Sequence, residues 1–222
     1  EKGLQISTEI GDRSGMASTN CNLSIAYLSL GEYQKAIEYS ENSLNICAEI
    51  GELSGIGSNN NNLGNAYLSL GEYQKAIEYY ENGLQIGTEI GDRSGIASKN
   101  GNLGNAYLSL GEYQNAIKYY EKGLQISTEI GDRSAIAKNN GNLGNAYLSL
   151  GEYQKAIEYN KKGLQISTEI GDQSGIASNN GNLGNAYLSL GEYQKAIEYY
   201  EKDLKISTEI GDRSGIASNN GN

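Results

Sequence analysis

The sequence contains no proline, histidine, tryptophan or phenylalanine in its 222 residues, and only two cysteines. Because proline breaks helix interiors, its absence over this length favours a helical chain. With no histidine and only Cys21 and Cys47 as thiols, we expect no metal site, no cofactor and no disulfide. Reduced thiols are typical of the cytoplasm, which is the compartment we expect.

Positive charge is also scarce, since the formal net charge is −10. Nucleic-acid phosphates and anionic membrane surfaces both attract clustered lysine and arginine. No run of about 18 apolar residues is present, which is the length that a spanning helix needs. We therefore expect neither a nucleic-acid partner nor a membrane partner.

What the chain does contain is a repeat of forty residues. The stretch NLGNAYLSLGEYQKAIEYYE at 62–81 recurs letter for letter at 182–201, and close copies begin at Asn22, Asn102 and Asn142. A fixed period of this size decides the architecture before other signals do, and the chain holds about five and a half copies. Since each unit of such an array buries its apolar face against its neighbours, we expect one domain over 1–222. The copies run over 21–60, 61–100, 101–140, 141–180 and 181–220, and both ends of the chain fall within predicted helices.

Each repeat is predicted to form two helices, so the fold class is all-α. Apolar residues recur at helical spacing over 13–29 and 33–50, with a tight turn at Gly31 between them. Gly51 is expected to end the second helix in the left-handed conformation, and Asp12 can cap the first. The same pattern predicts first helices at 53–69, 93–109, 133–149 and 173–189, and second helices at 73–90, 113–130, 153–170 and 193–210.

The spacing within each unit resembles the tetratricopeptide repeat (TPR). The residues that carry the resemblance are Leu63, Gly64, Tyr67, Gly71, Ala76, Tyr80 and Leu84 and their equivalents. It implies a right-handed solenoid of antiparallel helix pairs, with the first helices on the concave side. The forty-residue unit with its NLGNAY core resembles the Pins/LGN family of G-protein-signalling modulators. Asparagine stands where the general repeat has tryptophan, and no acidic G-protein-binding motif is present, so only peptide binding is implied.

An enzymatic reading finds no suitable residues. General acid–base or nucleophilic catalysis needs a side chain in a unique environment. Here nearly every side chain recurs forty residues later. We therefore expect no enzymatic activity.

Asparagine is the residue type that points to binding. The Pins/LGN resemblance implies that two series on the first helices hold an extended peptide in the concave groove. An asparagine amide offers donors and an acceptor, so it can pair with a peptide N–H and C=O at once. Alternatively, these residues were duplicated with the rest of the repeat, or tie adjacent helices together. The series comprise Asn22, Asn62, Asn65, Asn102, Asn105, Asn142, Asn145, Asn182 and Asn185.

Two functions remain open from the sequence. The first is a protein-interaction scaffold that binds a protein or extended peptide segment, with Arg93, Arg133 and Arg213 adding a preference for acidic ligands. The second is a structural spacer or self-stacking rod, which near-identical repeats favour. Head-to-tail self-association is expected through Ile6 and Ile10 at one end and Ile216 at the other, because a heterologous contact need not close.

Overall fold

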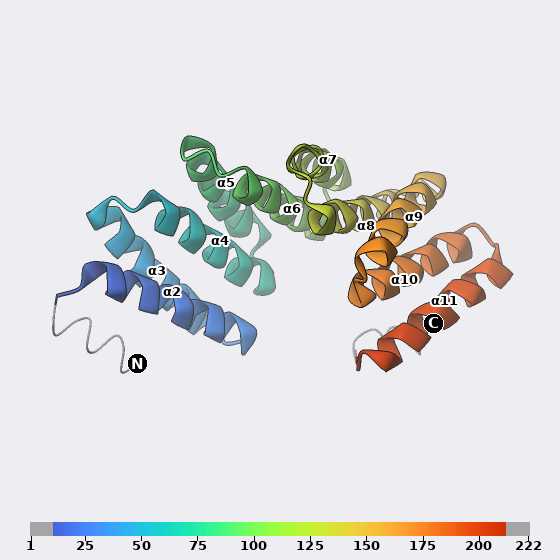
Figure 1. Cartoon of the computed structure of the whole chain (residues 1–222), viewed down its shortest axis with the longest axis horizontal. Coiled ribbons are helices and arrows are strands. Elements are labelled where there is room, and N and C mark those ends of the chain that lie inside the picture. The colour runs from blue at the N-terminus through green and yellow to red at the C-terminus, as the bar shows by residue number, and fades with distance from the viewer. Residues whose placement is uncertain (1–10, 212–222) are drawn as a thin grey trace. The chain divides into compact units, whose positions relative to one another are not determined.

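A computed structural model describes residues 11–211 as α-helices joined by short turns. The predicted all-α repeat fold is confirmed, and no strand occurs within these residues. The two expectations that fall outside them are the self-association through Ile6, Ile10 and Ile216 and the acidic-ligand preference of Arg213. Within residues 11–211 the helices group into two compact units, one up to residue 110 and one from residue 111 on; Figure 1 shows the helices.

The helix bounds follow the predicted pattern to within a residue. The first helix of each repeat, here called helix A, is α2 (Arg13–Ser29), α4 (Leu53–Ser69), α6 (Arg93–Ser109), α8 (Arg133–Ser149) and α10 (Gln173–Ser189). The second, helix B, is α3 (Tyr33–Ile50), α5 (Tyr73–Glu89), α7 (Tyr113–Ile130), α9 (Tyr153–Ile170) and α11 (Tyr193–Glu209). Gly31 and Gly51 have φ of 74°, so the turns lie in the left-handed region that glycine favours.

Packing within each unit joins consecutive helices. In the first unit α2 to α6 contact one another in chain order, and in the second α7 to α11 do the same. Helix A also contacts the next helix A, as α2 does α4 and α8 does α10. The cores are small: Leu63 and Ala66 of α4, and Leu143 and Ala146 of α8, are fully buried.

Glycine at the position of Gly64 lets helix B pack closely on helix A. A Cβ added to Gly64 would overlap the ring of Tyr80, and one added to Gly184 would overlap that of Tyr200. The aromatic ring therefore lies directly against the backbone of helix A. Within the described residues, no helix is both long and apolar enough to cross a bilayer.

Candidate functional site

The nine predicted asparagines all lie in the second half of the A helices. Asn22 is exposed, Asn62 is buried, and the other seven are half-buried. Residues of intermediate exposure on successive helices can touch both the protein and a ligand. The structure therefore leaves most of these amides partly accessible within each unit.

The second asparagine series is anchored by helix B. The Tyr80 hydroxyl donates to Asn65 Oδ1 at 2.7 Å, and the Tyr200 hydroxyl donates to Asn185 Oδ1 at the same distance. Asn145 differs because Asn160 stands where tyrosine would, and the Asn160 amide donates to the backbone carbonyl of Ala156, four residues earlier in the same helix. Asn145 makes no side-chain hydrogen bond within residues 11–211, so both ends of its amide remain available.

The first series partly ties repeats together. The Asn62 amide donates to Cys21 Sγ at 3.6 Å, and the Asn102 amide donates to Asn61 Oδ1 at 2.8 Å. In both pairs the acceptor belongs to the preceding helix A. These contacts match the alternative role of tying adjacent helices, so Asn62 and Asn102 contribute to cohesion whatever else they bind.

Two further asparagine series are buried. In the Asn60 series, each amide donates to the backbone carbonyl four residues earlier at 2.8 Å; its members are Asn20, Asn60, Asn100, Asn140 and Asn180. In the Asn179 series, Asn59, Asn139 and Asn179 make the same kind of bond. Sequence reasoning noted the first series only as a replacement for tryptophan and missed the second. The signal that could have identified both series is that their asparagines recur at the same position of successive repeats.

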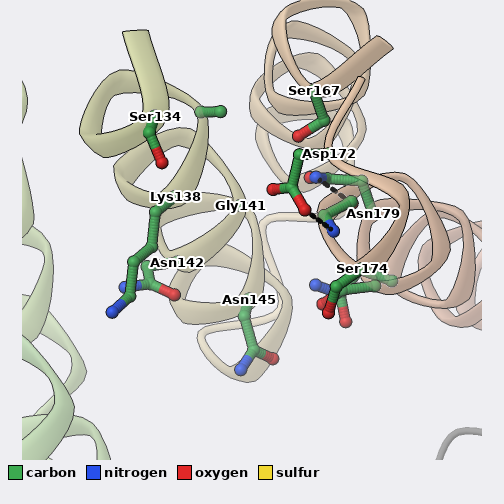
Figure 2. A pocket seen from close by; sticks show the side chains of 13 residues that line it. Ser134, Lys138, Gly141, Asn142, Asn145, Ser167, Asp172, Ser174 and Asn179 are labelled. Carbon is green, nitrogen blue, oxygen red and sulfur yellow. Dashed lines mark hydrogen bonds between the residues drawn. The ribbon is translucent and has the colours of Figure 1, made fainter. Parts of the chain in front are cut away.

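One open cavity in the second unit collects three of the predicted residues. It has a volume of about 420 Å³ and lies between α8, α9 and α10, lined by Asn142, Asn145 and Asn182 among others. Figure 2 shows Asn142 and Asn145 on the α8 wall, opposite Asp172 and Asn179. A smaller cavity of about 320 Å³ occupies the corresponding place between α2, α3 and α4 in the first unit.

The inner part of the larger cavity carries hydrogen-bond acceptors. Asp172 Oδ1 caps α10 by accepting from the Gly175 N–H at 3.0 Å. Ser167 Oγ and Asn179 Oδ1 are buried, and neither has a hydrogen-bond partner within the described part of the chain. Buried polar atoms are usually paired, so these two oxygens indicate a place for a donor.

The two cysteines lie in the first repeat. Cys21 is half-buried and Cys47 is buried, and both are free thiols. Burial is the largest cause that raises the pKa of each thiol, which disfavours the reactive thiolate. Among residues 11–211, no group of three or more histidine, cysteine, aspartate or glutamate side chains is arranged to hold a metal ion.

Comparison with protein families matches nearly all of the described chain. The family model described as "Tetratricopeptide repeat" matches residues 15–89, 55–129, 95–169 and 133–209. A search of curated protein sequences gave no match.

Solved structures share the fold at low identity. Aspartyl phosphate phosphatase F from Bacillus subtilis matches with a TM-score of 0.85 and 17% identity, over 98% of this chain but 57% of its own. A Rap protein complexed with competence and sporulation factor matches with a TM-score of 0.81 and 16% identity, over 93% of this chain and 57% of its own. A Podosopora anserina putative kinesin light chain with nearly identical TPR-like repeats matches with a TM-score of 0.70 and 22% identity, over 89% of this chain and 97% of its own. These likenesses show the fold.

Proposed function

Since the chain belongs to the tetratricopeptide repeat family, we propose that it is a protein-interaction scaffold without enzymatic activity. Its ligand is an extended peptide segment that lies along the A helices and is held by their asparagine amides. A similar fold occurs in a Rap protein complexed with competence and sporulation factor, which makes ligand binding compatible with this architecture. The resemblance of the NLGNAY core to the Pins/LGN family supports the same mode.

The observation that carries the proposal is the cavity between α8, α9 and α10. Asn142, Asn145 and Asn182 line it together, and Asn142 and Asn145 make no side-chain hydrogen bond within the described residues. An extended peptide rises about 3.3 Å per residue, so about three of its residues pass one helix A when neighbouring helices lie about 10 Å apart. Each repeat then offers two amides to that stretch. Recognition is mainly through the peptide backbone, so we expect modest sequence selectivity.

The decisive experiment removes the two unpaired amides. Peptides are selected from a random library against the whole chain, and their affinity is compared with Asn142→Ala/Asn145→Ala. Each lost pair of hydrogen bonds should weaken binding by about 1 kcal/mol or more. Circular dichroism should show unchanged helicity, because neither side chain bonds to the rest of the described chain.

Asn115→Ala supplies the matched control. Asn115 is an exposed amide on α7 whose hydrogen bond is to Glu112 on the same helix surface. Its removal should leave peptide affinity unchanged. Peptides that bind the double variant as tightly as the parent would rule out the asparagine ladder, and a chain that selects no peptide would favour the spacer or self-stacking rod.

A further inference from the structure

We infer that the cavity between α8, α9 and α10 is a receptor for a primary ammonium group, filled by a lysine side chain of the bound partner. This inference rests on the proposed function, because the lysine belongs to the peptide held by the asparagines at the same cavity. The structure supplies the receiving groups, and one repeat of the chain supplies its own ammonium at the corresponding place.

The receiving groups are three oxygens from two helices and the turn between them. Ser167 comes from the end of α9, Asp172 from the turn, and Asn179 from α10. A Cβ placed on Gly175 would touch both Asp172 Oδ2 and Ser167 Oγ, so these two oxygens flank one small space. Figure 2 shows the three side chains on the same side of the cavity.

These oxygens require a donor-rich ligand. Ser167 is 1% exposed and Asn179 is 4% exposed, and neither Ser167 Oγ nor Asn179 Oδ1 has a partner within the described residues. Asn179 Oδ1 is a carbonyl oxygen and can only accept, and the amide nitrogen of the same side chain already donates to Gly175 O at 2.7 Å. An ammonium group carries three hydrogen-bond donors and no acceptor, and its positive charge would face the carboxylate of Asp172. A carboxylate or phosphate would meet the like charge of Asp172 and the acceptor oxygen of Asn179, with only the Ser167 hydroxyl able to donate to it.

The corresponding place between α5 and α6 shows what fills this space. Lys99 occupies the position of Asn179 and is buried, at 8% exposed. The Cε of Lys99 lies against Gly83 of helix B, in the same way that Asn179 Oδ1 lies against Gly163. Its Nζ lies 3.2 Å from the point where a Cβ on Gly95 would sit, next to Asp92. The ammonium therefore lies beside Gly95 and Asp92, the equivalents of Gly175 and Asp172.

Burial and the nearby carboxylate act in opposite directions on Lys99. Desolvation by burial lowers the pKa of Lys99, while the charge of Asp92 raises it. The Lys99 side chain is buried there even though position 87 is glycine and provides no hydroxyl. At the open cavity Ser167 of α9 adds that hydroxyl, so this cavity offers an ammonium more acceptors than the filled one does.

The cavity rim is suited to a peptide whose lysine points inward. Asn142 and Asn145 line the α8 side, where they can hold the peptide backbone. Lys138 lies beside Asn142 on that wall, is exposed, and leaves the acceptors opposite it uncovered (Figure 2). Arg133, from which a preference for acidic ligands was expected, forms an ion pair with Glu169.

Three single variants close or weaken the site by different means. Asn179→Lys installs the side chain that Lys99 of α6 has at the corresponding place. Gly175→Ala puts a methyl between Asp172 and Ser167, and the chain already tolerates Ala135 at this position, with Asp132 still capping its helix. Asp172→Asn removes the charge but keeps a good capping residue. Each of the three is made in a chain that also carries Glu52→Gln and is compared with the Glu52→Gln chain alone. Glu52→Gln removes the carboxylate of the corresponding cavity in the first unit.

The first probe is n-butylammonium chloride, with n-butanol as the uncharged control. Saturation-transfer NMR on the full chain should show transfer to n-butylammonium and little to n-butanol. Since hydrogen bonds to a charged group are roughly twice as strong as neutral ones, each variant should reduce that transfer by about fivefold or more. Circular dichroism confirms that the variants are folded. Equal transfer from both probes, or transfer that survives in the folded Asn179→Lys and Gly175→Ala chains, overturns the inference.

The second probe separates this inference from the proposed function. Library-selected peptides are compared with versions in which lysine is replaced by norleucine, which keeps the chain length and removes the ammonium. A loss of about tenfold that disappears in Asn179→Lys supports the lysine site. If peptides bind and depend on Asn142 and Asn145 but norleucine binds equally well, the scaffold stands and the ammonium site fails. If n-butylammonium binds as expected but no peptide does, the site stands and the peptide function fails.

Discussion

At the scale of single residues, position 160 decides how α9 packs on α8. Asn160 is fully buried where Tyr80 stands in α5, and a Cβ on Gly144 would overlap it just as one on Gly64 would overlap Tyr80. The smaller side chain fills the same socket with fewer atoms. It also leaves Asn145 without the tyrosine hydroxyl that Asn65 receives.

Asn160→Tyr should therefore stabilise the protein. The added ring buries apolar surface, and its hydroxyl is placed to reach Asn145 as that of Tyr80 reaches Asn65. We expect a gain in the free energy of unfolding of about 2 kcal/mol, seen as a higher thermal midpoint. A lower midpoint would mean that the socket in the fourth repeat cannot accept the ring.

Ser40→Tyr is a control that should act in the opposite direction. Ser40 has the same buried position in α3, but its neighbour in α2 is Ser24 rather than glycine, and the two hydroxyls hydrogen-bond at 2.5 Å. The Cβ of Ser24 occupies the space that the tyrosine ring needs. Adding Ser24→Gly to Ser40→Tyr should recover stability.

At the scale of the element, the start of helix A depends on its capping residue. Asp12, Asp92, Asp132 and Asp172 each accept a hydrogen bond from the backbone N–H three residues later. Glu52 is the exception, and its side chain makes no capping bond to α4. The longer glutamate side chain leaves one more N–H at this helix end without a side-chain partner.

Glu52→Asp should supply the missing cap. The gain is expected to be about 1 kcal/mol in the free energy of unfolding, measured by urea denaturation. The reciprocal variant, Asp92→Glu, should lose a similar amount at α6. An unchanged midpoint in both variants would show that the capping bond does not contribute to stability here.

At the scale of the whole molecule, buried tyrosines make the free energy of unfolding depend on pH in the alkaline range. Burial raises the pKa of Tyr80 in the first unit and of Tyr120 and Tyr200 in the second. A tyrosine in the unfolded chain ionises near pH 10. The stability from these groups is therefore complete below about pH 10 and is lost as the pH rises toward their raised folded values.

We expect the free energy of unfolding to fall steeply above about pH 10. Lys99 acts in the opposite direction, because its lowered pKa makes burial less unfavourable as the pH rises through that value toward 10.5. The measurement is denaturant unfolding across the alkaline range. Tyr80→Phe, which keeps the ring and removes one ionisable group, should reduce the slope, and an unaltered slope would contradict the assignment to Tyr80.

Much of the fold could be predicted from the sequence, because its signals are local. The helix bounds follow from apolar spacing, and the turns follow from glycines such as Gly31 that adopt positive φ. The site was only partly predictable. Asn160 in place of tyrosine is visible in the sequence and explains why Asn145 differs from Asn65, yet that consequence requires knowing that the two side chains meet.

By itself, the sequence determined the period, the helix pairs and the choice of asparagine as the residue to examine. Only the tertiary structure decided what each asparagine does. Asn60 donates to a backbone carbonyl of its own helix, Asn65 accepts from Tyr80, and Asn179 presents an unpaired oxygen to a cavity. The burial of the Lys99 side chain was likewise decided by packing. The physical reason is that a hydrogen-bond partner depends on which neighbouring helix faces the side chain, whereas a helix and its turn depend on residues adjacent in the chain.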